Sequence, residues 1–379
     1  MVQKFFFYFK FLIKGNFNTR IKHKKIIIFD DESLTNKLFK DLANLDHVFI
    51  LKTRLSKIET VFINLNLIFR FFFFLIKCYN IQVAYFASII TLINPKIVLT
   101  NIDNCLIFSQ VSKLLYKKIA FLAVQNAARY QFEEPFFDKK IIKKFFIPEL
   151  ACFGKHEEES YKKNNIHVKK FLTSGSLKLS DYLEQKKDTK SKEKYDICLI
   201  LEESSGWDNL FPGFENAMGL IASHTARLAR EENLSLVIAG KRNNNFEKDR
   251  EKNFYSKYIP GDFSIKKSDL FSSYHLIEQS KITIGMMSTI LREGLALEKK
   301  ILSCNFSGCT AWNFPLKGIC FLNTPEYDVF SKRVKKIISL DFKNYKKLLS
   351  KDPKYLMLID KNNLPTKKIQ IRIDELIGK

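Results

Sequence analysis

Short apolar runs alternate along this chain with longer segments in which apolar residues recur every three or four positions. The run at residues 24–30, KKIIIFD, is β-branched and bounded by charges, which is typical of a strand buried in a parallel sheet. The segment after it, DESLTNKLFKDLAN, places Leu34, Leu38 and Leu42 on one face of a predicted helix. Further strands and helices follow in alternation, with a long helical region predicted over residues 56–93.

A polar interruption separates this series from a second one. Residues 184–194, EQKKDTKSKEK, contain no apolar side chain and are predicted to be a linker. Beyond them the apolar runs resume with YDICLILEES and continue to KKILSCN. The pattern predicts an α/β fold with two Rossmann-like domains, whose mostly parallel sheets face each other across a cleft. The first domain is predicted at residues 1–183, the second at 195–330, and C-terminal helices at 331–379.

The length, composition and net charge of the chain indicate the number of domains and the kind of partner. A length of 379 residues suits two ordinary domains, and 46% apolar with 27% charged residues is typical of a globular chain. The net charge of +23 is partly a matter of lysine-rich composition, but it also fits an anionic partner such as a nucleotide or a membrane surface. Nucleic acid is not an expected partner, because the chain has no aromatic RNA-binding motif and no zinc-finger spacing.

The cysteines and the aromatic residues bear on the compartment. Seven cysteines are scattered through apolar runs, which predicts reduced thiols in a cytoplasmic protein and neither disulfides nor a metal site. Two Phe-rich segments, residues 2–16 and 65–77, contain Lys10 and Arg70 and are too short to span a bilayer. Two interpretations stay open: both segments pack as helices on a sheet, or they lie in a membrane interface and make the protein peripheral on the cytoplasmic face of the inner membrane.

Polar side chains follow the predicted strands of the first domain, where parallel sheets bind their ligands. Asp31 and Glu32 follow the first strand and Asp103 follows the strand at PKIVLTN, so each is a candidate general base. Helix capping is the alternative role for these acids. The candidate acceptor-binding residues are Asn101, Asn104, Gln125, Asn126, Arg129, Ser174 and Ser176.

The segment IGMMSTILREGLALEKKIL, residues 284–302, passes from a predicted strand into a predicted helix. Ser288 and Thr289 would lie at the start of that helix, where unpaired backbone N–H groups and the helix dipole attract phosphate. Glu293 lies one turn later on the same face and could accept hydrogen bonds from a sugar or ribose hydroxyl. An ordinary capped helix has a similar signature, so capping stays an alternative. Three further donor-binding candidates follow other strands, namely Lys241, Ser204 and Ser205.

The segment HLIEQSKITIGMMSTILREGLALEKKIL resembles the donor-binding half of GT-B glycosyltransferases and of the related UDP-GlcNAc 2-epimerases. KIAFLAVQNAAR and ACFGKHEEESY, in the first half, resemble bacterial surface carbohydrate biosynthesis proteins, which are glycosyltransferases for capsule or lipopolysaccharide. The resemblance implies that Ser288 and Thr289 hold the donor phosphate and that Glu293 contacts the sugar or ribose. Two positions depart from the family pattern, because Ala127 and Glu298 stand where glycine is usual.

This resemblance implies a metal-independent glycosyltransferase without a bound cofactor. It would move a sugar from a nucleotide-sugar donor to a cell-surface glycan or a lipid-linked acceptor, with Asp31, Glu32 or Asp103 as the base. Two alternatives stay open, because a fold does not fix a function. One is an epimerase of UDP-sugars, and the other is a non-catalytic scaffold of surface-glycan assembly.

Overall fold

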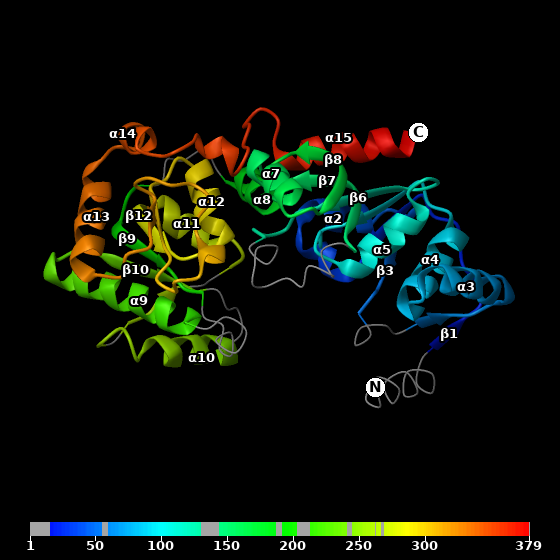
Figure 1. Ribbon diagram of the computed structural model, residues 1–379, viewed down its shortest axis with the longest axis horizontal. Helices are drawn as coiled ribbons and strands as arrows, with labels where there is room; N and C mark the ends of the chain where they lie inside the picture. The colour runs from blue at the N-terminus through cyan, green and yellow to red at the C-terminus, as the bar shows by residue number, and fades with distance from the viewer. Residues whose placement is uncertain are drawn as a thin grey trace.

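A computed structural model describes most of the chain, and its strands form two six-stranded sheets and one two-stranded sheet (Figure 1). The described residues are 16–54, 60–129, 144–186, 192–202, 213–240, 245–261, 263–266 and 269–378. Three donor-site candidates, Ser204, Ser205 and Lys241, lie outside these ranges, as does nearly all of the Phe-rich segment at residues 2–16.

The first large sheet is entirely parallel and has the strand order β3-β2-β5-β6-β7-β8. Its strands are β2 Ile26–Phe29, β3 Val48–Leu51, β5 Ile97–Thr100, β6 Ala120–Val124, β7 Phe146–Cys152 and β8 His167–Thr173. Every residue of β2 and β5 is buried, as expected of strands covered on both faces.

Helices cover both faces of this sheet. Their bounds are η1 Asp31–Thr35, α2 Lys37–Ala43, α3 Leu65–Cys78, α4 Ile81–Ile93, α5 Leu106–Leu115, α7 Lys155–Lys163 and α8 Leu177–Gln185. One face packs against α3, α4 and α5, and the other against α2 and the last helix of the chain. The β-branched strands thus bury apolar side chains on both sides.

The second large sheet is also parallel, with the order β11-β10-β9-β12-β13-β14 that dinucleotide-binding sheets adopt. Its strands are β9 Tyr195–Ile200, β10 Leu236–Ala239, β11 Ile265–Lys266, β12 Ser280–Gly285, β13 Ile301–Cys304 and β14 Phe321–Leu322. Its helices are α9 Phe214–Glu231, α10 Asn245–Tyr255, α11 Ser272–Glu278, α12 Thr289–Ala296 and α13 Tyr327–Ser339. The predicted fold of two Rossmann-like halves is therefore confirmed.

The long helical region predicted over residues 56–93 is wrong in detail. It contains a short strand, β4 Thr60–Phe62, which pairs with β1 Asn16–Asn18, and then two helices in place of one. The break between α3 and α4 has a local cause: Tyr79 adopts a left-handed backbone with a φ of 51°, and the side chain of Asn80 caps α4. A left-handed residue ends one helix, and the asparagine starts the next.

The last helix, α15 Pro365–Gly378, returns to the first half and packs along its sheet (Figure 1). Ile369 and Ile373 are buried there, and Arg372 donates two hydrogen bonds of 2.6 and 2.8 Å to Glu149 of β7. The segment before it contains α14 Phe342–Lys347, while Phe330 and Val334 of α13 belong to the core of the second half. The predicted C-terminal segment, residues 331–379, is therefore divided between the two halves.

Candidate functional site

In each large sheet, successive strands are added first toward one edge and then toward the other, and this direction changes at one central strand. In the first sheet β2 lies between β3 and β5, and in the second β9 lies between β10 and β12. Parallel α/β sheets bind ligands at the carboxyl ends of the strands at such a switch point. The residues after β2, β5, β9 and β12 are therefore the candidate site.

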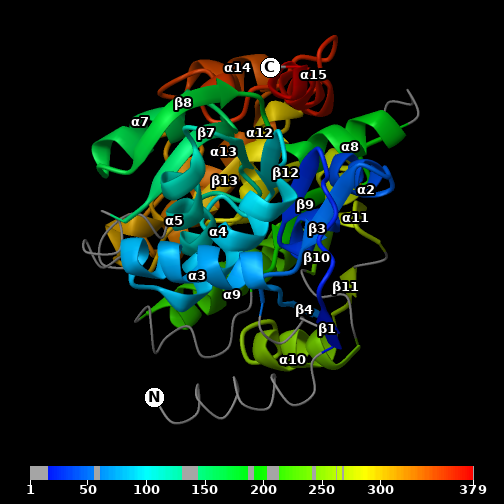
Figure 2. The ribbon, with the colours of Figure 1, turned by 90° about the vertical axis from the view of Figure 1, so that its right-hand side faces the viewer.

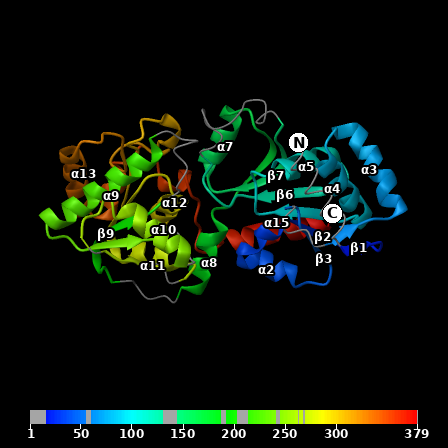
Figure 3. The same ribbon diagram turned by 90° about the horizontal axis from the view of Figure 1, so that it is seen from below.

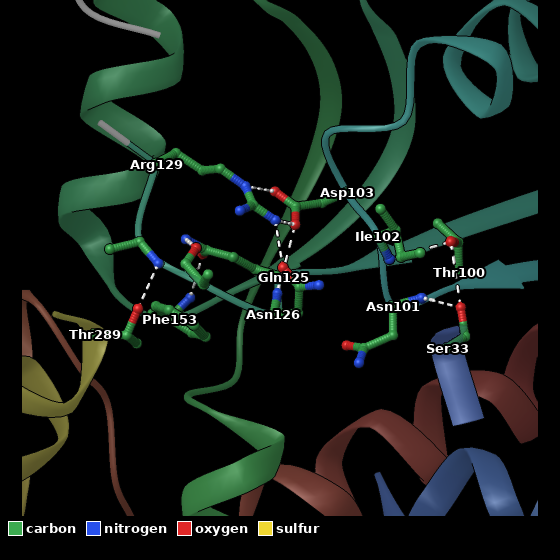
Figure 4. A network of polar contacts seen from close by, with 12 residues as sticks. Ser33, Thr100, Asn101, Ile102, Asp103, Gln125, Asn126, Arg129, Phe153 and Thr289 are labelled. Atoms are coloured by element: carbon green, nitrogen blue, oxygen red, sulfur yellow. Dashed lines mark hydrogen bonds and ion pairs between the residues drawn. The ribbon is translucent and has the colours of Figure 1, made fainter. Parts of the chain in front are cut away.

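At the first switch point a side chain joins the two loops. The backbone N–H of Asn101, after β5, donates a 2.9 Å hydrogen bond to Oγ of Ser33, after β2 (Figure 4). Asn101 is buried, and its side-chain oxygen has no hydrogen-bond partner among the residues that the structure describes. A buried amide oxygen without a donor is costly, so it is suited to accept a hydrogen bond from a ligand hydroxyl.

Asp30 shapes the loop after β2, although the sequence prediction selected the two residues that follow it, Asp31 and Glu32. Its backbone has a φ of 74°, and its buried carboxylate accepts hydrogen bonds from the N–H of Glu32 at 3.0 Å and from Thr53 at 2.8 Å. Arg54 adds a third, at 3.3 Å. Burial raises the pKa of Asp30, but these hydrogen bonds and the Arg54 charge outweigh burial and lower it. Asp30 therefore stays ionised and holds the loop.

The three predicted bases occupy different environments. Asp31 and Glu32 are half-buried at the start of η1, and Glu32 forms an ion pair with Arg54. Asp103 is fully buried and accepts hydrogen bonds from Nε of Arg129 at 2.8 Å and from the hydroxyl of Tyr161 at 2.8 Å. Since its oxygens already have these partners, Asp103 supports the loop after β6.

Arg129 completes this support. Burial lowers the pKa of its guanidinium, but the adjacent Asp103 carboxylate outweighs that effect and raises it. Arg129 also donates a 2.5 Å hydrogen bond to the side-chain oxygen of Asn126, an exposed residue (Figure 4). Of the candidates on this loop, Asn126 is thus the one that faces solvent.

The other acceptor-binding candidates bond mainly to the backbone. Gln125 is buried, accepts a 3.1 Å hydrogen bond from the N–H of Phe153 and donates one of 2.9 Å to the carbonyl of Ala127. Ser174 is buried and donates to the carbonyl of Cys152 at 3.3 Å. Asn104 is half-buried in the loop after β5.

At the second switch point, α12 begins with a hydroxyl that does not cap it. Ser288 occupies the N-cap position, yet its side chain makes no capping hydrogen bond, so the capping alternative does not describe it. Thr289 has another partner, because its hydroxyl oxygen accepts a 2.9 Å hydrogen bond from the N–H of Ala128 in the first half. The start of α12 thus lies against the loop after β6, as Figure 4 shows for Thr289.

Glu202 is a residue that the sequence prediction missed. It lies after β9, is buried, and its carboxylate accepts a 3.0 Å hydrogen bond from the N–H of Met287. An acidic side chain here places a negative charge beside the start of α12, where backbone N–H groups and the helix dipole attract anions. A carboxylate directly after a strand was the available signal, in the sequence LILEES.

Glu293 lies at the junction of the two halves. Its carboxylate is buried and accepts a 2.6 Å hydrogen bond from the hydroxyl of Ser176, at the start of α8. Burial raises the pKa of Glu293, while the Lys178 charge and the hydrogen bond from Ser176 oppose that effect. Glu293 and Ser176 therefore connect the halves directly.

A buried ion pair, also absent from the sequence prediction, accompanies that hydrogen bond. Arg292 of α12 contacts the carboxylate of Glu157 of α7, and each side chain is at most 3% exposed. Burial raises the pKa of Glu157, and the Arg292 charge opposes that effect. In the described part of the chain, no group of three or more His, Cys, Asp or Glu residues could hold a metal ion.

Comparisons with known proteins agree with this architecture. Residues 122–367 match a family model described as "putative O-antigen biosynthesis protein". No curated protein matches the sequence.

Solved structures resemble the whole chain at low identity. S. aureus MnaA with UDP is 13% identical, with a TM-score of 0.56 over 94% of this chain and 97% of that one. The UDP-GlcNAc 2-epimerase from Neisseria meningitidis bound to UDP-GlcNAc is 12% identical, with a TM-score of 0.50 over 93% and 99%. A variant of the wall teichoic acid polymerase TagF is 9% identical, with a TM-score of 0.50 over 95% and 90%. At these identities the likeness shows the fold alone.

Proposed function

Because the chain belongs to this family of O-antigen biosynthesis proteins, we propose that it is a nucleotide-sugar-dependent glycosyltransferase of surface-glycan assembly. The observation that carries the proposal is the start of α12, which lies at a switch point and has a Ser288 hydroxyl that makes no capping hydrogen bond. Helix N-termini at the carboxyl edge of such sheets are suited to bind phosphate groups.

In this proposal the donor diphosphate binds at the start of α12. The backbone N–H groups and the Ser288 hydroxyl donate hydrogen bonds to its oxygens, and the helix dipole stabilises the charge that develops when the nucleotide leaves. The bond from the anomeric carbon to the phosphate oxygen breaks, its electron pair leaves with the nucleoside diphosphate, and an acceptor hydroxyl forms the new bond. UDP and UDP-GlcNAc occur in two of the similar structures, which supports uridine nucleotides as the first donors to test.

The acceptor would bind in the first half. The side-chain oxygen of Asn101 is placed to accept a hydrogen bond from an acceptor hydroxyl. Asp31 or Glu32 would take the proton of the attacking hydroxyl, because both lie at the same switch point and are partly exposed. Asp103 is less suited to that role, since Arg129 and Tyr161 already occupy its oxygens. Catalysis without a metal or cofactor stays a prediction.

A second candidate function is epimerisation of a UDP-sugar. The structure that favours it is the UDP-GlcNAc 2-epimerase from Neisseria meningitidis, which matches 93% of this chain. The two reactions differ in one requirement: a transferase needs an acceptor, whereas an epimerase converts the nucleotide-sugar alone.

Calorimetric titration with UDP, GDP, CMP and their sugars, on the wild type and on Ser288→Ala, tests the proposal. We expect one nucleotide class to bind the wild type, and the variant to bind it about tenfold more weakly, as loss of one hydrogen bond to a charged group implies. Incubation of the winning nucleotide-sugar without an acceptor then separates the two reactions, because only an epimerase changes the sugar. No binding of any nucleotide, with or without added metal, would contradict both enzymes and favour the scaffold.

A further inference from the structure

Helix α3 has an apolar face that no described residue covers. The side chains of this face are between 53% and 74% exposed, and they are Leu65, Phe69, Phe72, Phe73 and Ile76. The opposite side of the helix is buried, with Leu67 and Phe74 packed into the core of the first half. Apolar patches of this kind mark interaction surfaces, because isolated soluble domains keep them small.

The position of α3 leaves this face accessible. Figures 1 and 3 place α3 at the end of the first half that is farthest from the second half, and Figure 2 shows it lying across that end. Tyr79 and Ile81, at the junction with α4, extend the apolar surface with exposures of 88% and 59%. The surface is therefore continuous from α3 to the start of α4.

A basic hollow of about 850 Å³ lies beside the same helix. Five basic side chains and no acidic ones line it, and the basic residues are Arg20, Lys22, His23, Arg70 and Lys118. Within the described ranges, no ion pair neutralises the four Lys and Arg residues among them. An unneutralised basic hollow attracts anions.

The apolar face and the basic hollow adjoin along α3. Asn66 and Arg70 line the hollow, and Phe69 and Phe73 lie one and three residues from Arg70 on the neighbouring face. Lys77 continues the basic side one turn further, with Nζ 4.0 Å from the centre of the Phe73 ring. A helix whose exposed face is aromatic and whose flank is cationic is suited to lie in the plane of a membrane interface.

We propose that α3 and the hollow beside it form a docking surface for a bilayer that contains anionic lipids. The aromatic face lies at the boundary between headgroups and acyl chains, and the hollow receives a lipid phosphate. Charge favours this partner over a second copy of the chain, because a two-fold contact through α3 would bring the basic flanks, with Arg70 and Lys77, toward each other. The proposal does not depend on the proposed reaction.

The docking surface lies at the amino ends of the strands of the first sheet, and the candidate site lies at their carboxyl ends. The hollow is lined by residues that precede β2, β5 and β6, such as His23, Asn94 and Lys118, whereas the candidate site follows β2 and β5. Substitutions at one end of the strands can therefore be tested without altering the other.

Sedimentation with lipid vesicles tests the proposal on the full chain, without any nucleotide. Vesicles of phosphatidylcholine alone are compared with vesicles that also contain phosphatidylglycerol. We expect the wild type to bind the anionic vesicles at least tenfold more tightly, and millimolar inorganic phosphate not to displace it. Phe69→Ser/Phe72→Ser should lose binding to both kinds of vesicle, and Arg70→Glu/Lys118→Glu should lose the preference for anionic ones.

Two controls make the result specific. Phe246→Ser removes an equally exposed aromatic side chain, 77% exposed on α10 in the second half, and should bind like the wild type. Ser288→Ala should also bind like the wild type, so a failed donor site would not be mistaken for failed docking. Equal binding by Phe69→Ser/Phe72→Ser and the wild type would overturn the proposal. The proposal would also be overturned if light scattering showed that the wild type is a dimer that dissociates in Phe69→Ser/Phe72→Ser, and if the wild type bound neither kind of vesicle.

Discussion

The hydroxyl of Ser176 donates a 2.6 Å hydrogen bond to the carboxylate of Glu293, which lies 117 residues later in the chain. The serine caps α8 of the first half, and the glutamate belongs to α12 of the second. Both are buried. Because Glu293 is only 3% exposed, a sugar or ribose could reach its carboxylate only if the side chains around it moved, so donor contact at Glu293 implies that the halves separate locally.

The raised pKa of Glu293 predicts a specific pH dependence. A carboxyl group whose pKa is higher in the folded state binds more protons there, so its contribution to stability grows as the pH falls toward the ordinary value of 4.5. Glu293→Gln should therefore be more stable than the wild type at pH 7, and this advantage should shrink toward pH 4.5. Urea denaturation at several pH values measures it. A constant difference across that range would contradict the prediction.

The buried pair of Arg292 and Glu157 should be sensitive to loss of one partner. Arg292→Met leaves a buried carboxylate without its cation, which costs about 3–5 kcal/mol of unfolding free energy. Arg292→Met/Glu157→Met removes both charges and should regain most of that loss. The midpoints of urea denaturation compare the three proteins, and a double variant no more stable than Arg292→Met would argue against the pairing.

Asp31 and Asp103 should respond differently to removal of their charge. Asp31→Asn should lower kcat by about 100- to 10,000-fold, the usual contribution of a general base, with little change in Tm. Asp103→Asn should lower Tm, because it leaves the Arg129 guanidinium without its buried partner at a cost of about 3–5 kcal/mol. Glu32→Asn serves as the comparison at the same switch point. Loss of activity in Glu32→Asn alone would assign the base to Glu32.

Glu202 should weaken the binding of anionic ligands at α12. Glu202→Gln keeps an oxygen for the N–H of Met287 but removes the negative charge. Two like charges about 8 Å apart repel by about 2 kcal/mol at an effective dielectric constant near 20, so the change should tighten nucleoside diphosphate binding about 30-fold. An uncharged nucleoside should bind both proteins equally. Glu326→Gln, an exposed change before α13, is the control in the same titration calorimetry, and an equal gain there would show a general charge effect.

Glu298, one of the two departures from the family pattern, adopts a left-handed backbone with a φ of 59°. A β-carbon makes that conformation costly, so the glycine that the family resemblance implies here would fit this backbone better. Glu298→Gly should raise the unfolding free energy by about 0.5–1 kcal/mol. Lys343→Gly, at an exposed helical position of α14, should lower it by about 1 kcal/mol. Urea denaturation compares both changes.

The central strands of the first sheet could be predicted from the sequence because they are short, rich in apolar residues and fully buried. Ile26–Phe29 and Ile97–Thr100 are examples, and the strand order of the sheet places the polar residues that follow them at the first switch point. The break at Tyr79 was not predictable in the same way, because a tyrosine carries no signal for a left-handed backbone.

The functions of individual site residues were harder to predict, because they depend on partners far along the chain. Thr289 accepts a hydrogen bond from Ala128, and Glu293 accepts one from Ser176. Local patterns describe a residue and its neighbours within a few turns, so they indicated a phosphate site but not contacts between the halves. The pairing of Arg292 with Glu157, 135 residues earlier, belongs to the same class.

The return of α15 to the first half limits how the two halves can move. The chain passes between them after α8 and again before α15, and Arg372 and Ile369 hold the second passage to the first sheet. Two connections act as two pivots, and two pivots define an axis. Any widening between the start of α12 and the loop after β6 is therefore a rotation about that axis, and sliding of one half along the other is disfavoured.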